Sequence, residues 1–133
     1  MEKQFGEYRI STDKGLLDLE RICRLLSNSY WANQRAVEVV RKSIDNSICY
    51  GIYRGSEQVG FARVVTDHAT VFYLCDVIID VAHRKQGLGK QLVACIIEQF
   101  GNLHSLLGTL DAHGLYEQYG FQRNERLMNR RVR

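Results

Sequence analysis

Apolar positions in the first third of the chain recur mostly at helical spacing. Before them, the short segment Tyr8–Ser11 predicts a first strand. Thr12 or Asp13 can cap the helix that follows, and an apolar face at three- and four-residue spacing supports this helix: Leu16, Leu19, Ile22, Leu25 and Leu26. After the polar stretch SNSYWANQ, a second helix is predicted from the apolar residues on one of its sides: Ala36, Val37, Val40 and Ile44.

From residue 47 onward the pattern changes to strand spacing. The segment SICYGIYRGSEQVGFARVVTD predicts a β-hairpin with its turn at residues 54–57, and ATVFYLCDVIIDV predicts a long strand that is apolar on both faces. The next helix is predicted by apolar residues at helical spacing: Leu88, Leu92, Val93, Ile96, Ile97 and Phe100. A strand at residues 106–112, a short helix ended by Gly120 and a last strand complete the order β-α-α-β-β-β-α-β-α-β. This order predicts an α/β fold with a mixed sheet.

Length and composition indicate an ordinary globular protein with a single domain over residues 1–133. Hydrophobic residues make up 45% of the chain and charged residues 25%. The net charge of +3 is too small to predict a nucleic-acid partner unless the charges cluster. One weak cluster lies in NERLMNRRVR, for which a solvated terminus is the simpler interpretation: Arg126, Arg130, Arg131 and Arg133.

No segment of the chain indicates export or membrane insertion. The start, MEKQFGEYRIS, lacks an apolar core, and no stretch approaches the roughly 20 apolar residues of a membrane span. The four cysteines are widely spaced without a CxxC pair, so neither a zinc site nor a redox dithiol is indicated. We therefore expect a cytoplasmic protein with reduced thiols and no membrane partner.

Candidate chemistry is concentrated where the long strand meets the following helix, in VIIDVAHRKQGLGKQLV. Glycine permits positive φ and close approach of the backbone to a ligand, and a helix N-terminus favours phosphate. The P-loop pattern fails because Gln91 stands where Ser or Thr is needed, and the dinucleotide fingerprint fails because a third glycine is missing. The turn alone leaves two interpretations open, a phosphate site and a turn whose glycines serve only its geometry.

The segment from Arg84 to Gly89, RKQGLG, resembles the [Q/R]-x-x-G-x-[G/A] signature of the GNAT-type N-acetyltransferase superfamily. The downstream segment LYEQYGF also resembles a pattern found near the C-terminus of that family. The resemblance covers nearly the whole chain. It implies a GNAT-like fold with a mixed, mostly antiparallel sheet of six to seven strands, about four flanking helices, and a splay between the fourth and fifth strands.

The resemblance also implies acetyl-coenzyme A as the co-substrate. In such proteins the pantetheine arm enters the splay and pairs with the fourth strand, which here implies the backbone of Val77, Ile78 and Ile79. The pyrophosphate is then expected on the turn that follows: Arg84, Lys85, Gln86, Gly87, Leu88, Gly89 and Lys90. The usual proton donor to the departing thiolate is the first tyrosine of the second motif, Tyr116, for which packing under the helix is the alternative role.

Two interpretations of Asp76 stay open. A carboxylate in apolar surroundings has a raised pKa and accepts a proton readily, whereas a hydrogen bond or an ion pair with Arg63 would make it structural. Asp111 and His113 are placed to relay a proton through water, but two ligands without a third do not indicate a metal site. We predict no metal. The acceptor amine is expected near residues of the helix–helix break and the hairpin: Tyr30, Trp31, Arg35 and Arg63.

The predicted function is transfer of the acetyl group of acetyl-CoA to a primary amine, on a small molecule or a protein, by direct attack in a ternary complex. One alternative is a non-catalytic module that binds acyl-CoA as a sensor. A second alternative is an interaction protein that uses its arginine-rich end. Dimerisation, which is common in this superfamily, is left open.

Overall fold

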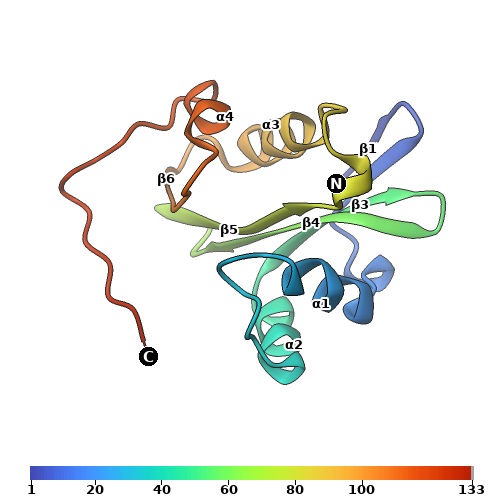
Figure 1. Ribbon diagram of the computed structural model, residues 1–133. Coiled ribbons are helices and arrows are strands. Elements are labelled where there is room, and N and C mark those ends of the chain that lie inside the picture. Colours follow the sequence, from blue (N-terminus) through green and yellow to red (C-terminus); the bar gives the residue numbers. More distant parts are fainter. Residues whose placement is uncertain (133) are drawn as a thin grey trace.

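The computed structural model describes residues 1–132, which form one sheet with helices on both faces (Figure 1). Six strands lie in chain order across the sheet of these residues: β1 (Glu2–Phe5), β2 (Tyr8–Ser11), β3 (Ile48–Arg54), β4 (Glu57–Thr66), β5 (Val71–Ile79) and β6 (His104–Leu107). Neighbouring strands are antiparallel except β5 and β6, which are parallel. The predicted α/β fold with a mixed, mostly antiparallel sheet is therefore confirmed. Arg133, part of the predicted basic cluster, lies outside the described residues.

The helices form two layers, one on each face of the sheet. Helices α1 (Leu19–Ser27) and α2 (Val37–Asp45) lie on one face, and α3 (Leu88–Phe100) and α4 (His113–Glu117) lie on the other (Figure 1). Each layer has its own apolar cluster: Ile22, Leu26 and Val40 pack with Phe61 under α1 and α2, whereas Leu92 and Ile96 pack with Tyr50 and Phe72 under α3. Burial of these apolar faces holds both helix layers on the sheet.

Helix α1 begins later than predicted. Asp13 caps only a short 3-10 helix, η1 (Lys14–Leu16), through a 2.9 Å hydrogen bond from the amide of Gly15. Leu17 is extended, and a second cap follows at Asp18, whose Oδ1 accepts from the amide of Arg21 at 3.1 Å. The prediction of one helix capped by Thr12 or Asp13 is therefore wrong, because two separate aspartate caps divide the segment.

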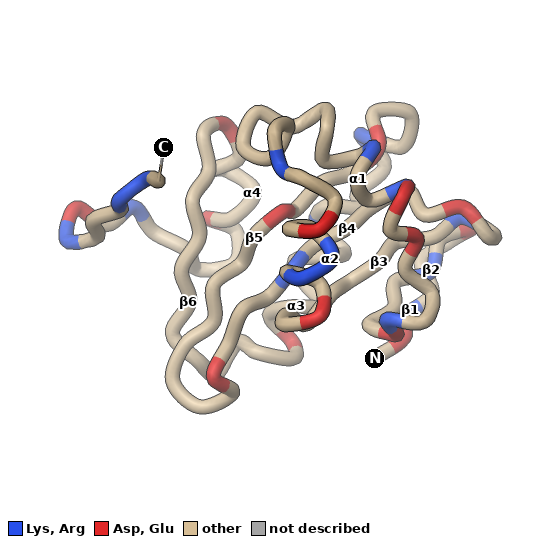
Figure 2. The backbone as a smooth tube through the Cα atoms, turned by 90° about the horizontal axis from the view of Figure 1, so that it is seen from below, with Lys and Arg blue, Asp and Glu red and all other residues tan. Residues whose placement is uncertain are grey.

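The two ends of the chain differ from the prediction. Strand β1, which the pattern did not predict, pairs with β2 around Gly6 at a φ of 56°. The strand predicted at residues 106–112 corresponds to β6, which begins two residues earlier, at His104, and ends at Leu107. The predicted last strand is absent from residues 122–132, which run away from the sheet (Figure 1) and carry basic residues near their end (Figure 2).

Strand β5 loses its β6 partner halfway along its length. The pairing of β5 with β6 covers Val71 to Leu74 and stops there, although β5 continues to Ile79. Because β1 is an addition to the predicted order, these strands are the predicted fourth and fifth ones. The splay between them is therefore confirmed. Among the helices of residues 1–132, none is long and apolar enough to cross a membrane.

Candidate active site

A β-bulge in the middle of β5 sets the position of Asp76. Asp76 and Val77 together face Ala62 of β4, so β5 carries one extra residue between the flanking pairs Phe61–Ile78 and Arg63–Cys75. Asp76 itself is left-handed, with a φ of 54°. This backbone conformation is unusual for a residue with a side chain and is tolerated best by Asp and Asn among such residues.

The bulge reverses the alternation of side chains along β5. Leu74 packs in the apolar cluster under α3, but Ile78 packs in the cluster under α1 and α2. Without the extra residue, both side chains would lie on the same face. Strict alternation along the strand predicts one side for Leu74, Asp76 and Ile78, but Asp76 shares its face with Ile78 and not with Leu74. Asp76 lies on the α1 and α2 face, where its partners are.

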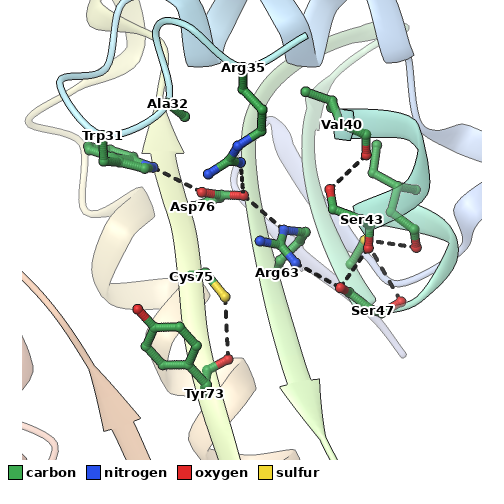
Figure 3. Close-up of polar contacts among 12 residues, drawn as sticks. Trp31, Ala32, Arg35, Val40, Ser43, Ser47, Arg63, Tyr73, Cys75 and Asp76 are labelled. Atoms are coloured by element: carbon green, nitrogen blue, oxygen red, sulfur yellow. Dashed lines mark hydrogen bonds and ion pairs between the residues drawn. The ribbon is translucent and has the colours of Figure 1, made fainter. Parts of the chain in front are cut away.

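Three side chains converge on the carboxylate of Asp76 (Figure 3). The indole Nε1 of Trp31 donates to Oδ1 at 2.9 Å, and Oδ2 accepts from Nη1 of Arg35 at 2.7 Å and from Nε of Arg63 at 2.8 Å. Arg63 also donates to the hydroxyl of Ser47 at 2.9 Å. The loop between α1 and α2 is thereby tied to β4 and β5, and only 2% of the Asp76 side chain is exposed.

The arginines decide the protonation state of Asp76. Burial by itself raises the pKa of this carboxyl, but hydrogen bonds and charge from Arg35 and Arg63 outweigh burial and hold the pKa below its ordinary value. The expected raised pKa is therefore wrong, because the surroundings that looked apolar in the sequence contain two guanidinium groups. This geometry favours the structural interpretation of Asp76, in which Arg63 was the named partner.

A cavity of about 670 Å³ opens beside this cluster. Its volume is in the range of small-molecule sites. The four residues predicted to contact the acceptor all line it, together with Asp76, Val77 and Tyr116: Tyr30, Trp31, Arg35 and Arg63. A further wall is formed by residues 107–112, from the end of β6 onward, where the amide of Leu110 donates to the hydroxyl of Tyr30 at 3.1 Å. Of this wall, sequence reasoning singled out only Asp111, because residues 106–112 were predicted as a strand and not as a segment that lines a cavity.

Tyr116 lies in α4 with its ring buried and its hydroxyl available to the cavity. The ring packs edge-on against Phe121 at 5.8 Å between centroids. Within residues 1–132 the hydroxyl has no hydrogen-bond partner, yet it is not fully enclosed. Burial, with smaller contributions from Tyr30 and Asp111, raises the pKa of Tyr116 to about 12. The phenol is therefore protonated at neutral pH and able to donate.

The turn after β5 presents main-chain amides outward. Lys85 and Gly87 are both left-handed, with φ of 65° and 80°, and helix α3 begins directly afterwards at Leu88. Within the described chain, none of the amides of residues 85–90 donates to a protein acceptor. Such a run of unpaired amides at a helix N-terminus suits an anion. These residues do not line the cavity described above but lie beyond the far end of the unpaired half of β5.

Neighbouring side chains brace this turn. The hydroxyl of Tyr8 lies 2.9 Å from Nδ1 of His83 and donates to Oε1 of Gln86 at 3.1 Å. Both bonds form together if Nδ1 carries the proton and donates to the hydroxyl. From the second motif, Tyr119 donates to the carbonyl of Lys90 at 3.0 Å. The second motif therefore contacts the residue that directly follows the first motif. Tyr8 is a bracing residue that no sequence signal marked.

If this turn binds the pyrophosphate of acetyl-CoA, as the sequence resemblance implies, Tyr8→Phe should weaken acetyl-CoA binding about 3- to 10-fold, which corresponds to the roughly 1 kcal/mol of a typical hydrogen bond. The ring would keep its edge-on packing against His83, so the fold should persist. Calorimetric titration measures the effect. Tyr53→Phe is the control, because the buried Tyr53 hydroxyl has no partner in the described chain. Equal affinities for both variants would show that the bracing bonds do not matter.

Three comparisons place the chain among known proteins. The acetyltransferase (GNAT) domain family matches residues 45–123. A Gibberella zeae protein named as an acetyltransferase is 31% identical over an alignment of 113 positions, which covers 70% of this chain and 64% of that protein. The chain thus spans less than two thirds of that curated relative.

Solved structures agree with this family assignment. A GNAT-family protein from Xanthomonas campestris, known from a crystal structure, is 39% identical in sequence to this chain. The two structures superpose with a TM-score of 0.86, over 94% of this chain and 93% of the Xanthomonas chain. A GNAT acetyltransferase from Elizabethkingia anophelis, solved with acetyl-CoA bound, shares the fold at 16% identity and a TM-score of 0.69, over 91% of this chain and 80% of its own. The family match, the relative and the splayed sheet agree, and the chain belongs to the GNAT acetyltransferase family.

Proposed function

We propose that the protein transfers the acetyl group of acetyl-CoA to a primary amine. One observation carries the proposal: unpaired amides of residues 85–90, an unpaired stretch of β5 and the available Tyr116 hydroxyl occur together in one fold. Each element suits a different part of acetyl-CoA. The GNAT family uses acetyl-CoA, and one relative of the same fold holds it in its crystal structure.

The diphosphate would bind the amides of the turn, and the arm would continue along β5. From residue 76 to residue 80 an extended strand covers roughly 13 Å, at about 3.3 Å per residue. An arm lying along this stretch connects the turn to the cavity at its other end. Main-chain groups of Val77, Ile78 and Ile79 on the side facing β6 lack a strand partner in the described chain, so they are available to pair with the arm.

The reaction itself needs few groups from the protein. A neutral amine attacks the thioester carbonyl, its nitrogen forms a bond to that carbon, and the bond from carbon to sulfur breaks. The amine gives up a proton to solvent or a base, and the leaving thiolate receives one. Tyr116 is protonated at neutral pH and lines the cavity, so we assign it as the donor to sulfur.

Asp76 has a different role in this proposal. Its oxygens are occupied by Trp31, Arg35 and Arg63, and its pKa lies below the ordinary value. A carboxylate held in this way accepts a proton poorly. We therefore assign Asp76 as a positioning residue that holds the acceptor wall of the cavity, in place of the general base considered from the sequence.

We expect Tyr116→Phe to lower turnover about 10- to 100-fold, in the lower part of the range for general acid catalysis. Acetyl-CoA affinity should change less than about twofold, because the ring still packs against Phe121. Thiol release with an excess of acceptor measures the rate, and Tyr53→Phe is the matched control. Undiminished turnover where the chemical step limits the rate would assign Tyr116 to packing. Acetyl-CoA binding without turnover of any amine in the wild-type protein would favour the sensor alternative.

A further inference from the structure

The cluster around Asp76 holds more positive than negative charge. Arg35 and Arg63 both contact the same oxygen, Oδ2 of Asp76, so one carboxylate serves two guanidinium groups. Both arginines line the cavity, and their guanidinium groups approach the Asp76 carboxylate from two sides (Figure 3). Their side chains are 23% and 13% exposed, which leaves them partly shielded from water. A charge in such surroundings acts more strongly than one at the open surface.

The two arginines also have unused hydrogen-bond donors. Arg35 donates through Nη1, and Arg63 donates through Nε and Nη1. Within residues 1–132, Nε and Nη2 of Arg35 and Nη2 of Arg63 have no protein acceptor. A guanidinium group offers five N–H donors in a planar fork that matches carboxylate and phosphate oxygens. The remaining donors are therefore suited to an anionic group in the cavity.

The lining of the whole cavity also has more basic than acidic residues. Its acidic residues are Asp76 and Asp111, and its basic residues are Arg35, Arg63, Arg130 and Arg131. Asp76 is already engaged by arginine, so Asp111 is the one acidic group of this wall without an ion pair in the described chain. A second ammonium group on the acceptor would find only the Asp111 carboxylate here, whereas an anionic group would find several guanidinium donors.

We propose that the acceptor is a small primary amine that also carries an anionic oxygen group, a carboxylate or a phosphate, bound by Arg35 and Arg63. This assignment rests on the proposed acetyltransferase function and names its substrate class. The anionic group anchors the acceptor on the α1 and α2 face of the sheet, and the amine then points toward the gap between β5 and β6. Trp31 adjoins this anchor, since its indole Nε1 donates to the same Asp76 carboxylate.

A matched set of acceptors tests the class. The set is 4-aminobutyrate, its neutral amide 4-aminobutanamide, 1,4-diaminobutane and 3-aminopropyl phosphate, repeated with one methylene fewer and one more. Thiol release from acetyl-CoA gives kcat/KM for each. We expect an anionic member to exceed the neutral amide by at least about 10-fold at the best length, since charge-assisted hydrogen bonds are the strong ones. The anionic acceptor with the higher kcat/KM shows whether the site prefers a carboxylate or a phosphate. A neutral amide or a diamine that equals the anionic members would overturn the proposal.

A second readout does not depend on turnover. Trp31 is the only tryptophan of the chain, so its fluorescence reports on the cluster around Asp76. Butyrate or propyl phosphate should change this fluorescence in a saturable way, at concentrations at least about 10-fold below those of butyramide. Equal responses would overturn the proposal even if no acceptor in the set is acetylated. Conversely, a selective response in a protein that binds no acetyl-CoA would leave the anion site standing and refute the proposed acetyl transfer.

Arg35 variants separate recognition from folding. Arg35→Gln should reduce the ratio of kcat/KM for the anionic acceptor to kcat/KM for the neutral acceptor toward 1. Arg35→Lys should retain part of this ratio, because lysine keeps the positive charge but lacks the planar pair of N–H donors of the guanidinium group. Arg24→Gln is the control, since Arg24 is exposed on α1 and makes no ion pair within the described chain. A merely structural role would lower both activities equally and leave the ratio unchanged, which would contradict the proposal. If Arg35→Gln does not fold, the ratio in Arg35→Lys still gives the answer.

Discussion

Replacing Gly87 with glutamate is expected to weaken acetyl-CoA binding by about 100-fold or more, which equals about 2.7 kcal/mol. Two effects combine. The backbone of Gly87 has a φ of 80°, which costs a side-chain-bearing residue about 1–2 kcal/mol. The new carboxylate would also stand beside the amides of residues 85–90, where the negative diphosphate is expected to bind, and like charges repel. Calorimetric titration of the folded variant measures the loss.

Gly55→Glu is the matched control for this experiment. Gly55 has a φ of 60°, lies exposed in the turn between β3 and β4, and has no neighbouring atom within 4 Å of the position that a Cβ would take. It therefore carries similar backbone strain and the same change in charge, away from the turn after β5. We expect it to bind acetyl-CoA as the wild-type protein does. If both variants lose affinity equally, or if Gly87→Glu binds normally, the diphosphate does not lie on this turn.

Asp76→Asn is expected to lower the free energy of unfolding by about 3–5 kcal/mol, the usual cost of removing one partner of a buried ion pair. The amide keeps the shape of the carboxylate but leaves Arg35 and Arg63 without a counter-charge. Because whole domains are stable by only about 5–15 kcal/mol, the loss is a large fraction of the total. Chemical denaturation measures it.

The same substitution predicts a change in acid sensitivity. The pKa of Asp76 in the folded protein lies below its ordinary value of 3.8, so the charged carboxylate stabilises the fold above that pH. This stabilisation is lost as the pH falls through 3.8 toward the folded pKa. The Asp76→Asn variant should lack this part of the acid response. Asp111→Asn, which removes an exposed carboxylate from the same cavity, is the control and should change stability by less than about 0.5 kcal/mol. Equal stabilities of the two variants would contradict the role given to Asp76.

Much of the architecture was predictable because strong local patterns decide it. The hairpin of β3 and β4 and the long strand β5 are mostly apolar runs, and helix α3 has apolar residues at helical spacing; the structure buries most of these residues. Gly87 adopts the left-handed conformation that a glycine at this turn permits. By contrast, β1 has only partly buried and exposed residues, so its alternation gave no signal. The strand predicted at the C-terminal end does not form, and the apolar side chains there are exposed, with Met128 at 96%.

Part of the candidate site was predictable in its residues, but its geometry was not. Tyr30, Trp31, Arg35 and Arg63 are spread over two separate segments of the sequence, and the structure brings all of them to one cavity. What joins them is the bulge at Asp76, where a single extra residue moves a carboxylate to the other face of the sheet. A strict alternation of side chains cannot reveal such a bulge, because it depends on pairing with β4. One of the two interpretations of Asp76 gave it a raised pKa because it assumed apolar surroundings, whereas the structure places Arg35 and Arg63 against the carboxylate.

The most direct test of the central claim is a crystal structure of the protein with acetyl-CoA bound. We predict diphosphate oxygens within hydrogen-bond distance of amides in residues 85–90, and the thioester arm beside residues 75–79 in the gap between β5 and β6. A diphosphate bound elsewhere, or a β6 that closes against β5 beyond Leu74 and leaves no room for the arm, would contradict the account.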